Sequence, residues 1–197
     1  VGASGDLAPL AHLALGLLGE GRMWDATAQR WDDTAVVLAR HRLAPAVLGA
    51  KDGLALINGT QFTTCLTAEA LARTAVLIRT ADVVAALTLE ALRGTHRAFH
   101  AALHAARPHA GQRDVAARMR ALLHRAPDNR SPIYESHATC DRVQDAYTLR
   151  CVPQVHGVVT DAYRFVLTTV TTELNSATDN PVIITPHRCD AQQWAAR

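Results

Sequence analysis

The sequence predicts an all-α protein, a bundle of long helices, from three observations. The stretch from Thr60 to Arg93 contains no glycine or proline and, if helical throughout, would form a helix about 50 Å long. Runs of strand length in which apolar and polar residues alternate are nearly absent. Near the N-terminus, leucines recur at the spacing of one helix face, namely Leu7, Leu10, Leu13, Leu17 and Leu18.

Capping residues indicate where the helices of the first half begin and end. Gly19 ends the first helix. Asp32 and Asp33 are suited to cap a second helix, which must stop before Pro45. Gly94 is suited to cap the C-terminus of the long helix. Because alanine, leucine and valine cover most of the circumference of that helix, we expect it to be buried among other helices.

After the long helix, the sequence predicts four further helices and two loops. The helices are expected over residues 95–105, 111–126, 136–150 and 154–174. Pro153 separates the last two of these helices. The loops, over 126–132 and 175–181, are rich in residues that form turns.

Composition excludes several classes of protein. The 197 residues are 49% hydrophobic, which excludes a disordered chain, and the 11 glycines follow no period, which excludes a fibrous one. Lys and Arg number 20 against 18 Asp and Glu, a balance unlike that of a dedicated nucleic-acid binder. No segment approaches the ~20 apolar residues of a membrane span, and no signal peptide is visible. We therefore expect a cytoplasmic protein that binds neither nucleic acid nor membranes.

Length and cysteine content bear on the chain as a whole. The length suits one domain or a part of a larger protein. The first residue is Val1 rather than Met, and we expect an incomplete chain. The four cysteines form no C-x-x-C pair, and we expect them to be reduced, partly buried thiols: Cys65, Cys140, Cys151 and Cys189.

The glycine-containing segment before the first helix has two interpretations. One is a small-residue turn, since a Walker loop would need a lysine here and a nucleophile elbow would need glycine in place of Asp6. The other is a reaction of the backbone itself. Because Gly5 has no Cβ, its nitrogen can approach the carbonyl carbon of Ala3 and close a five-membered ring. Loss of water from Ser4 would then leave a methylidene group, which is a strong electrophile.

Five separate blocks of the chain indicate a family. They are VGASGDLAPLAHLAL at 1–15, GLALINGTQ at 53–61, RPHAGQ at 107–112, DRVQDAYTLRCVPQVHG at 141–157 and TTELNSATDNP at 171–181. In composition and order these blocks resemble the aromatic amino acid ammonia-lyases. The sequence after Ile183 departs from the family pattern. We therefore expect a partial lyase domain over 1–182 and a divergent tail over 183–197.

The resemblance implies a fold, a prosthetic group and a reaction. The fold is the central part of the aspartase/fumarase-like ammonia-lyase fold. The prosthetic group is 4-methylidene-imidazol-5-one, formed autocatalytically from Ala3, Ser4 and Gly5, with no metal. The reaction eliminates ammonia from an L-amino acid. The resemblance also implies a homotetramer whose active sites combine several subunits, with a catalytic tyrosine upstream of Val1, and we expect residues 1–197 alone to be inactive.

Four more residues take roles from the family motifs. Asn58 resembles an asparagine that hydrogen-bonds near the prosthetic group and the substrate carboxylate, and it could also cap the long helix. Arg150 resembles the arginine that holds the substrate carboxylate, although on its own it would suggest an interhelical salt bridge. Gln144, a substrate-binding residue by resemblance, would share a helix face with Tyr147. Tyr147 would donate to the prosthetic group or move a proton.

Histidines bear on metal binding and on the substrate. His96, His100 and His104 would share one helix face at a spacing that can bind zinc, but no acidic or cysteine ligand lies in register, and we expect a solvated face. His156 stands where relatives acting on phenylalanine or tyrosine tend to carry another residue. It therefore favours L-histidine as the substrate and trans-urocanate as the product. The alternatives are a tyrosine or phenylalanine lyase or aminomutase, and a non-catalytic helical scaffold.

Overall fold

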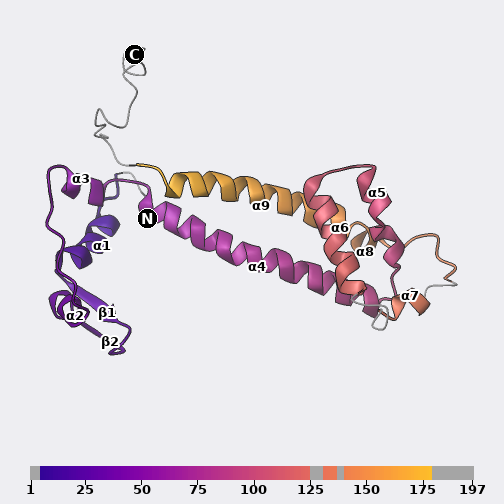
Figure 1. Ribbon diagram of the computed structural model, residues 1–197, viewed down its shortest axis with the longest axis horizontal. Coiled ribbons are helices and arrows are strands. Elements are labelled where there is room, and N and C mark those ends of the chain that lie inside the picture. The colour runs from indigo at the N-terminus through magenta and orange to yellow at the C-terminus, as the bar shows by residue number, and fades with distance from the viewer. Residues whose placement is uncertain (1–4, 125–130, 137–139, 179–197) are drawn as a thin grey trace, which may run out of the picture. The chain divides into compact units, whose positions relative to one another are not determined.

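The computed structural model describes residues 5–124, 131–136 and 140–178, and most of them are helical (Figure 1). The predicted all-α fold class is confirmed. Contacts divide the chain into two units, residues 1–67 with 171–197, and residues 68–170. None of the helices in the described ranges is long and apolar enough to cross a membrane.

The first unit begins with a helix and a hairpin. Helix α1 (Ala8–Leu18) ends where the sequence predicts, because Gly19 adopts a left-handed φ of +79° and its N–H donates to the carbonyl of Leu15. Strands β1 (Arg22–Asp25) and β2 (Arg30–Asp33) then form an antiparallel hairpin. The sequence did not predict this hairpin, since each strand has only four residues and shows no clear alternation.

A buried carboxylate holds the hairpin to helix α2 (Thr34–Arg40). Asp25 accepts hydrogen bonds from the N–H groups of Thr27 and Ala28, at 2.8 and 3.0 Å, and from the guanidinium of Arg40. The Ala28 N–H and the Arg40 side chain are the main reasons that the pKa of Asp25 lies well below its ordinary range. The hairpin and α2 therefore share one ionised anchor.

Two short helices complete this part of the chain. Asp33 occupies the N-cap position of α2, as predicted, although its side chain makes no capping hydrogen bond. The helix ends at Arg40, before Pro45, also as predicted. Helix α3 (Asp52–Ile57) packs against α1 and ends at Asn58.

The long helix predicted over 60–93 is observed as α4 (Gln61–Ala91). It ends in a Schellman motif, in which the Gly94 N–H donates to the Leu89 carbonyl at 2.7 Å. The left-handed residue of this cap is Arg93, with φ +50°, rather than Gly94. Glycine is needed at position 94 for space, because a Cβ there would overlap Leu89 and lie 3.1 Å from Oδ2 of Asp145.

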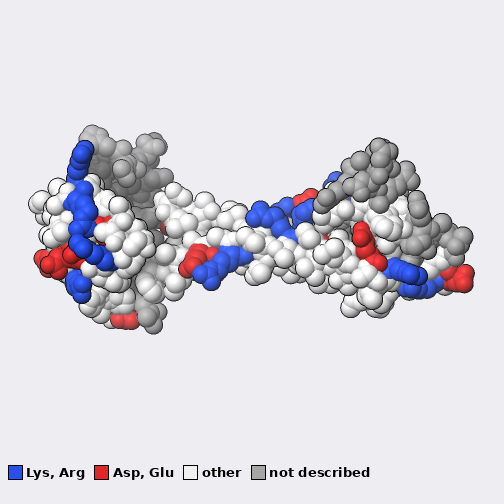
Figure 2. Space-filling view, turned by 90° about the horizontal axis from the view of Figure 1, so that it is seen from below, with Lys and Arg blue, Asp and Glu red and all other residues white. Residues whose placement is uncertain are grey.

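The expectation that α4 is surrounded by other helices is wrong within this chain. Its buried residues are Leu71, Asp82, Ala86 and Leu89. Other apolar residues of the same helix are more than half exposed, namely Leu66, Val76, Leu77, Val84 and Leu87. In Figure 2 most of the surface over α4 is accordingly uncharged. The described residues therefore leave an apolar face of α4 uncovered.

The core of the second unit lies where the end of α4 meets the helices that follow. These are η1 (His96–Phe99), α5 (Ala101–Ala105), α6 (Ala110–Leu123) and α7 (Ile133–Ser136). The main buried apolar cluster comprises Ala86, Leu89, Phe99, Val115, Met119, Leu123, Ile133, Leu149 and Val152. The helix predicted over 95–105 is interrupted at His100, where ψ is 134° and the ring Nδ1 accepts from the Ala102 N–H.

The helix predicted over 136–150 is wrong. The chain is non-helical from residue 140 to 146, and only a short helix α8 (Tyr147–Arg150) follows. The reason is tertiary: the Asp145 carboxylate accepts from the Thr95 N–H at 2.5 Å, and Ala146 takes an extended conformation with ψ 152°. A contact across 50 residues outweighs the local preference for helix.

Helix α9 (Val152–Leu174) closely matches the helix predicted over 154–174. It crosses α6 where two glycines meet. A Cβ on Gly111 would overlap the carbonyl oxygen of Gly157, and a Cβ on Gly157 would lie 2.5 Å from the backbone nitrogen of Gln112. The two helix backbones therefore approach as closely as they do only because neither residue has a side chain.

Candidate functional site

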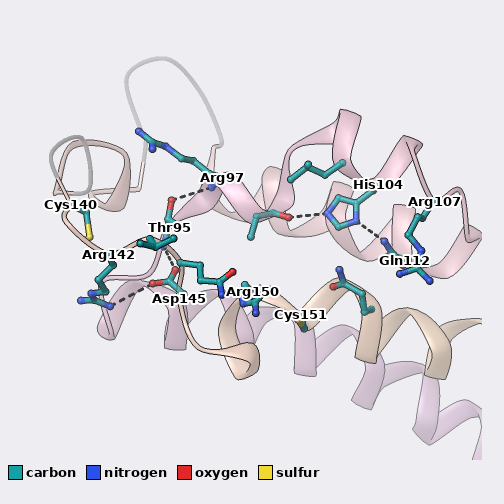
Figure 3. Close-up of a pocket in the computed structure, with 15 residues that line it drawn as sticks. Thr95, Arg97, His104, Arg107, Gln112, Cys140, Arg142, Asp145, Arg150 and Cys151 are labelled. Atoms are coloured by element: carbon teal, nitrogen blue, oxygen red, sulfur yellow. Dashed lines mark hydrogen bonds and ion pairs between the residues drawn. The ribbon is translucent and has the colours of Figure 1, made fainter.

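The second unit contains a cavity of about 420 Å³ formed by η1, α5, α6 and the segment 140–154 (Figure 3). Four arginines line it: Arg97, Arg107, Arg142 and Arg150. Among the described lining residues, Asp145 is the one carboxylate, and it pairs with Arg142 at 3.5 Å. Cationic side chains therefore exceed anionic ones, which suits a small anionic ligand.

Two of the predicted site residues, Gln144 and Arg150, line this cavity together. Tyr147 lies beside them, because the guanidinium carbon of Arg150 sits 4.1 Å from the centre of the Tyr147 ring. The Tyr147 side chain is otherwise open, with 72% of its surface exposed. The structure thus brings together three of the residues that the sequence singled out.

The predicted reason for this grouping is wrong. Gln144 and Tyr147 do not share a helix face, because Gln144 lies in the non-helical segment before α8. Ala146, which precedes the first residue of α8, accepts hydrogen bonds from the N–H groups of Leu149 and Arg150. Gln144 and Arg150 reach the same cavity from the two ends of this turn.

Arg150 has the surroundings expected of a ligand-binding side chain. Within the described residues it forms no ion pair, so the interhelical salt bridge suggested by its type is not observed there. Its Nε is buried and has no hydrogen-bond partner in the same part of the chain. A buried N–H without an acceptor is costly. The planar guanidinium, which lines the cavity, is suited to bind a carboxylate there bidentately.

Sequence reasoning missed the buried pair formed by His104 and Gln112, which also lines the cavity. Nε2 of His104 lies 3.0 Å from the carbonyl oxygen of Ala98, which can only accept. Nδ1 therefore accepts from the side-chain nitrogen of Gln112, also at 3.0 Å. Both ring nitrogens are engaged, so His104 orders the wall of the cavity and is not free to act as a base there.

The three histidines predicted to share a solvated face do not do so. His104 is buried, His100 caps α5, and His96 stacks on Tyr134 with ring centres 3.8 Å apart. The break at His100 separates the two short helices that carry them. Over the described ranges, no three His, Cys, Asp or Glu side chains are grouped as a metal site would require.

His156 does not line the cavity, although the sequence links it to the choice of substrate. Its Nδ1 lies 2.8 Å from Oδ1 of the buried Asp82. The other carboxylate oxygen of Asp82 accepts from Nε of Arg118 at 2.6 Å. His156 therefore belongs to a polar contact that joins α9, α4 and α6.

The remaining predicted residues lie in the first unit or outside the described residues. Asn58 ends α3 and is half-buried, and because α4 begins at Gln61, Asn58 is not placed as its N-cap. Near it, the Thr60 hydroxyl donates to Glu173 at 2.9 Å. Gly5 is exposed, with φ +82°. Ala3 and Ser4 lie outside the described residues, as does the tail over 183–197.

The fold is that of a long-helix protein, and its arginine-lined cavity suits a small anionic ligand. The aromatic amino acid lyase family model matches residues 1–195, and the chain belongs to this family.

Several known members of the family are similar to this chain in sequence or structure. It is 61% identical over 183 residues to a histidine ammonia-lyase of Bos taurus, covering 93% of this chain and 28% of the bovine protein. The crystal structure of histidine ammonia-lyase from Trypanosoma cruzi matches 93% of this chain and 32% of its own, with a TM-score of 0.75 and 45% identity. A tyrosine aminomutase from Streptomyces globisporus matches with a TM-score of 0.74 and 40% identity, over 94% of this chain and 38% of its own. The chain thus spans about a third of these relatives' length.

Proposed function

We propose that the protein containing this chain removes ammonia from L-histidine without oxidation and gives trans-urocanate. The observation that carries the proposal is Arg150, a cavity-lining guanidinium that forms no ion pair with the described residues. A substrate carboxylate is the acceptor that such a group binds best. The 61% identity to a histidine ammonia-lyase supports histidine as the amino acid that brings this carboxylate.

The reaction needs an electrophile, because an amine is a poor leaving group and the hydrogen on the β-carbon is barely acidic. We assign it to 4-methylidene-imidazol-5-one formed from Ala3, Ser4 and Gly5. Gly5 is suited to that cyclisation because it has no Cβ, and its φ of +82° lies in the left-handed region that favours glycine. When formed, the group would supply the electrophile that the elimination needs.

The other site residues bind and orient the substrate or move a proton. Arg150 holds the carboxylate in a bidentate pair, and the amide of Gln144 adds a hydrogen bond from the same cavity. Tyr147, whose ring packs on Arg150, has a phenol that can donate to the prosthetic group or transfer a proton. Asn58 hydrogen-bonds near the prosthetic group and the carboxylate.

The proposal includes an assembly. The working enzyme is a cytoplasmic homotetramer in which each active site combines residues of several subunits. The apolar residues exposed along α4 support such an assembly, because a large uncovered apolar face marks an interface. In this account residues 1–182 form part of the lyase domain, residues 183–197 form a divergent tail, and residues 1–197 alone are inactive.

The similarity to a tyrosine aminomutase favours one alternative, in which the substrate is L-tyrosine or L-phenylalanine. The carboxylate contact of Arg150 would be the same, because all three amino acids share that group. The alternatives differ in the ring of the substrate and, for an aminomutase, in whether ammonia leaves or returns at the β-carbon.

The experiment is an assay of the full reading frame that encodes this chain, with L-histidine, L-tyrosine and L-phenylalanine as separate substrates. We expect urocanate absorbance and free ammonia to rise together with histidine alone. Coumarate, cinnamate or a β-amino acid as the main product would favour the alternative substrates. No product from any of the three would contradict the proposal and favour the remaining alternative, a non-catalytic helical scaffold.

A further inference from the structure

We infer that Asp145 is a positioning residue for Gln144 and Arg150, and that it acts through its hydrogen bond to the backbone of Thr95. The inference rests on the proposed function for the roles of Gln144 and Arg150. Asp145 takes no part in the proposed chemistry. Its position in the fold is what suggests its role.

Asp145 is a buried carboxylate at the edge of the cavity, with 2% of its side chain exposed. Oδ2 accepts from the Thr95 N–H at 2.5 Å, and Oδ1 lies 3.5 Å from the guanidinium of Arg142 (Figure 3). Arg142 is half-exposed and three residues away, so its contact is local and weak. The bond to Thr95 spans 50 residues and is the stronger constraint.

The Thr95 N–H is a firm point of attachment. It directly follows the Schellman motif at the end of α4, where Gly94 bonds back to Leu89. The Thr95 hydroxyl also accepts from the Arg97 N–H at 3.3 Å and so caps η1. Gly94 leaves room for the carboxylate, since a Cβ at this position would crowd Oδ2 of Asp145.

The segment that carries the predicted site residues has few other attachments. Between residues 140 and 149, only Asp145 and Leu149 are buried, and the others are exposed. Leu149 packs into the apolar core, and Asp145 is bonded to Thr95. Gln144 directly precedes Asp145, and Arg150 lies one helical turn beyond Ala146. Without the Asp145 anchor, the N-terminal end of this turn would be held only by exposed residues.

The inference predicts coupling between Asp145 and Arg150. If Asp145 acts by placing Arg150, removal of the Asp145 carboxylate should lower kcat/KM most in the background in which residue 150 is arginine. We would measure kcat and KM for histidine in the full-length enzyme and in Asp145→Ala, Arg150→Lys and the double variant. Asp145→Asn keeps an oxygen that accepts from Thr95, and Asp114→Asn removes a surface carboxylate of α6 as a matched control.

We expect Asp145→Ala to lower kcat/KM at least tenfold, chiefly through KM, but less than threefold when Arg150 is already Lys. Asp145→Asn should stay within threefold of the parent, as should Asp114→Asn. An equal fold-loss in both backgrounds would overturn the inference, and so would an Asp145→Asn variant as impaired as Asp145→Ala. If Asp145→Ala does not fold, Asp145→Ser, whose hydroxyl is too short to reach Thr95, takes its place in the same cycle.

A second measurement separates this inference from the proposed function. Amide hydrogen exchange at Thr95 and over residues 144–150 should become faster in Asp145→Ala and remain unchanged in Asp114→Asn. Unchanged exchange would overturn the inference whatever the substrate proves to be. Failure of the parent to deaminate histidine would instead contradict the proposed function, and the kinetic cycle would then be run with the amino acid that is turned over.

Discussion

The His156 imidazole and the Asp82 carboxylate form a hydrogen bond of 2.8 Å that joins α9 to α4. Asp82 is buried, so a carboxylate with only one partner would be costly there. Its second oxygen is bonded to Arg118 of α6, which completes its partners. Three helices of this unit therefore meet at one carboxylate, and His156 is part of the packing between them.

This contact predicts that His156 contributes to stability and not to substrate choice. His156→Leu should lower the free energy of unfolding by about 2 kcal/mol, because the buried Asp82 loses a donor. His156→Gln, which can still donate, should lose less. The ratio of kcat/KM for histidine to that for tyrosine should not change in either variant. A tenfold shift of this ratio towards tyrosine, with an unchanged melting temperature, would assign His156 to substrate selection.

Arg150 should respond differently to a conservative change. Arg150→Lys keeps the charge but loses the bidentate geometry, so we expect kcat/KM for histidine to fall by about a hundredfold. The melting temperature should change little, because Arg150 forms no ion pair with the described residues. The matched control is Arg164→Lys, which alters a surface ion pair with Asp114. Kinetics of Arg150→Lys that match the control would assign Arg150 to structure.

The crossing of α6 and α9 makes Gly157 sensitive to any side chain. Gly157→Ala should lower the free energy of unfolding by about 1–3 kcal/mol, because backbone atoms of α6 occupy the space of the new methyl group. Gly53→Ala is the matched control, since no atom lies within 4 Å of its Cβ position in α3. Chemical denaturation of both variants would measure the difference. Equal stabilities would show that the helices do not cross at Gly157.

The stability of the hairpin and α2 should depend on pH through Asp25. Its folded pKa lies below the unfolded value of about 3.9, owing to the Ala28 N–H and Arg40. The stabilisation is therefore fully present above that unfolded value and is lost as the pH falls through the lower folded pKa. Asp25→Asn should be less stable than the parent near neutral pH, and the gap should narrow below about pH 4. A gap that is constant with pH would contradict the ionised anchor.

Patterns within a single helix could be predicted from the sequence. The length of α4 follows from a run without glycine or proline, and the end of α1 follows from Gly19. Local signals of this kind act over a few residues, so they are visible in the chain itself. The hairpin at 22–33 could not be predicted, because its strands are too short to show an alternation of apolar and polar residues.

Features that depend on distant partners could not be predicted. The helix expected over 136–150 is replaced by an extended turn because Asp145 accepts a hydrogen bond from Thr95. A partner 50 residues away cannot be predicted from the local sequence pattern. The same turn brings Gln144 and Arg150 to one cavity by a route that helical spacing did not predict. Helical spacing predicts a solvated face for His104, because its buried partner, Gln112, lies on another helix.

The most direct test of the account is the mass of the peptide that contains Ser4, isolated from the active full-length enzyme. Cyclisation of Ala3, Ser4 and Gly5 removes two molecules of water, so the peptide should be lighter by about 36 Da than its sequence requires, as expected for an electrophile built from the backbone. Ser4→Ala lacks the hydroxyl that leaves as the second water, so it cannot form the methylidene and should lose nearly all urocanate formation. An active enzyme whose Ser4 peptide has its unmodified mass would contradict the account.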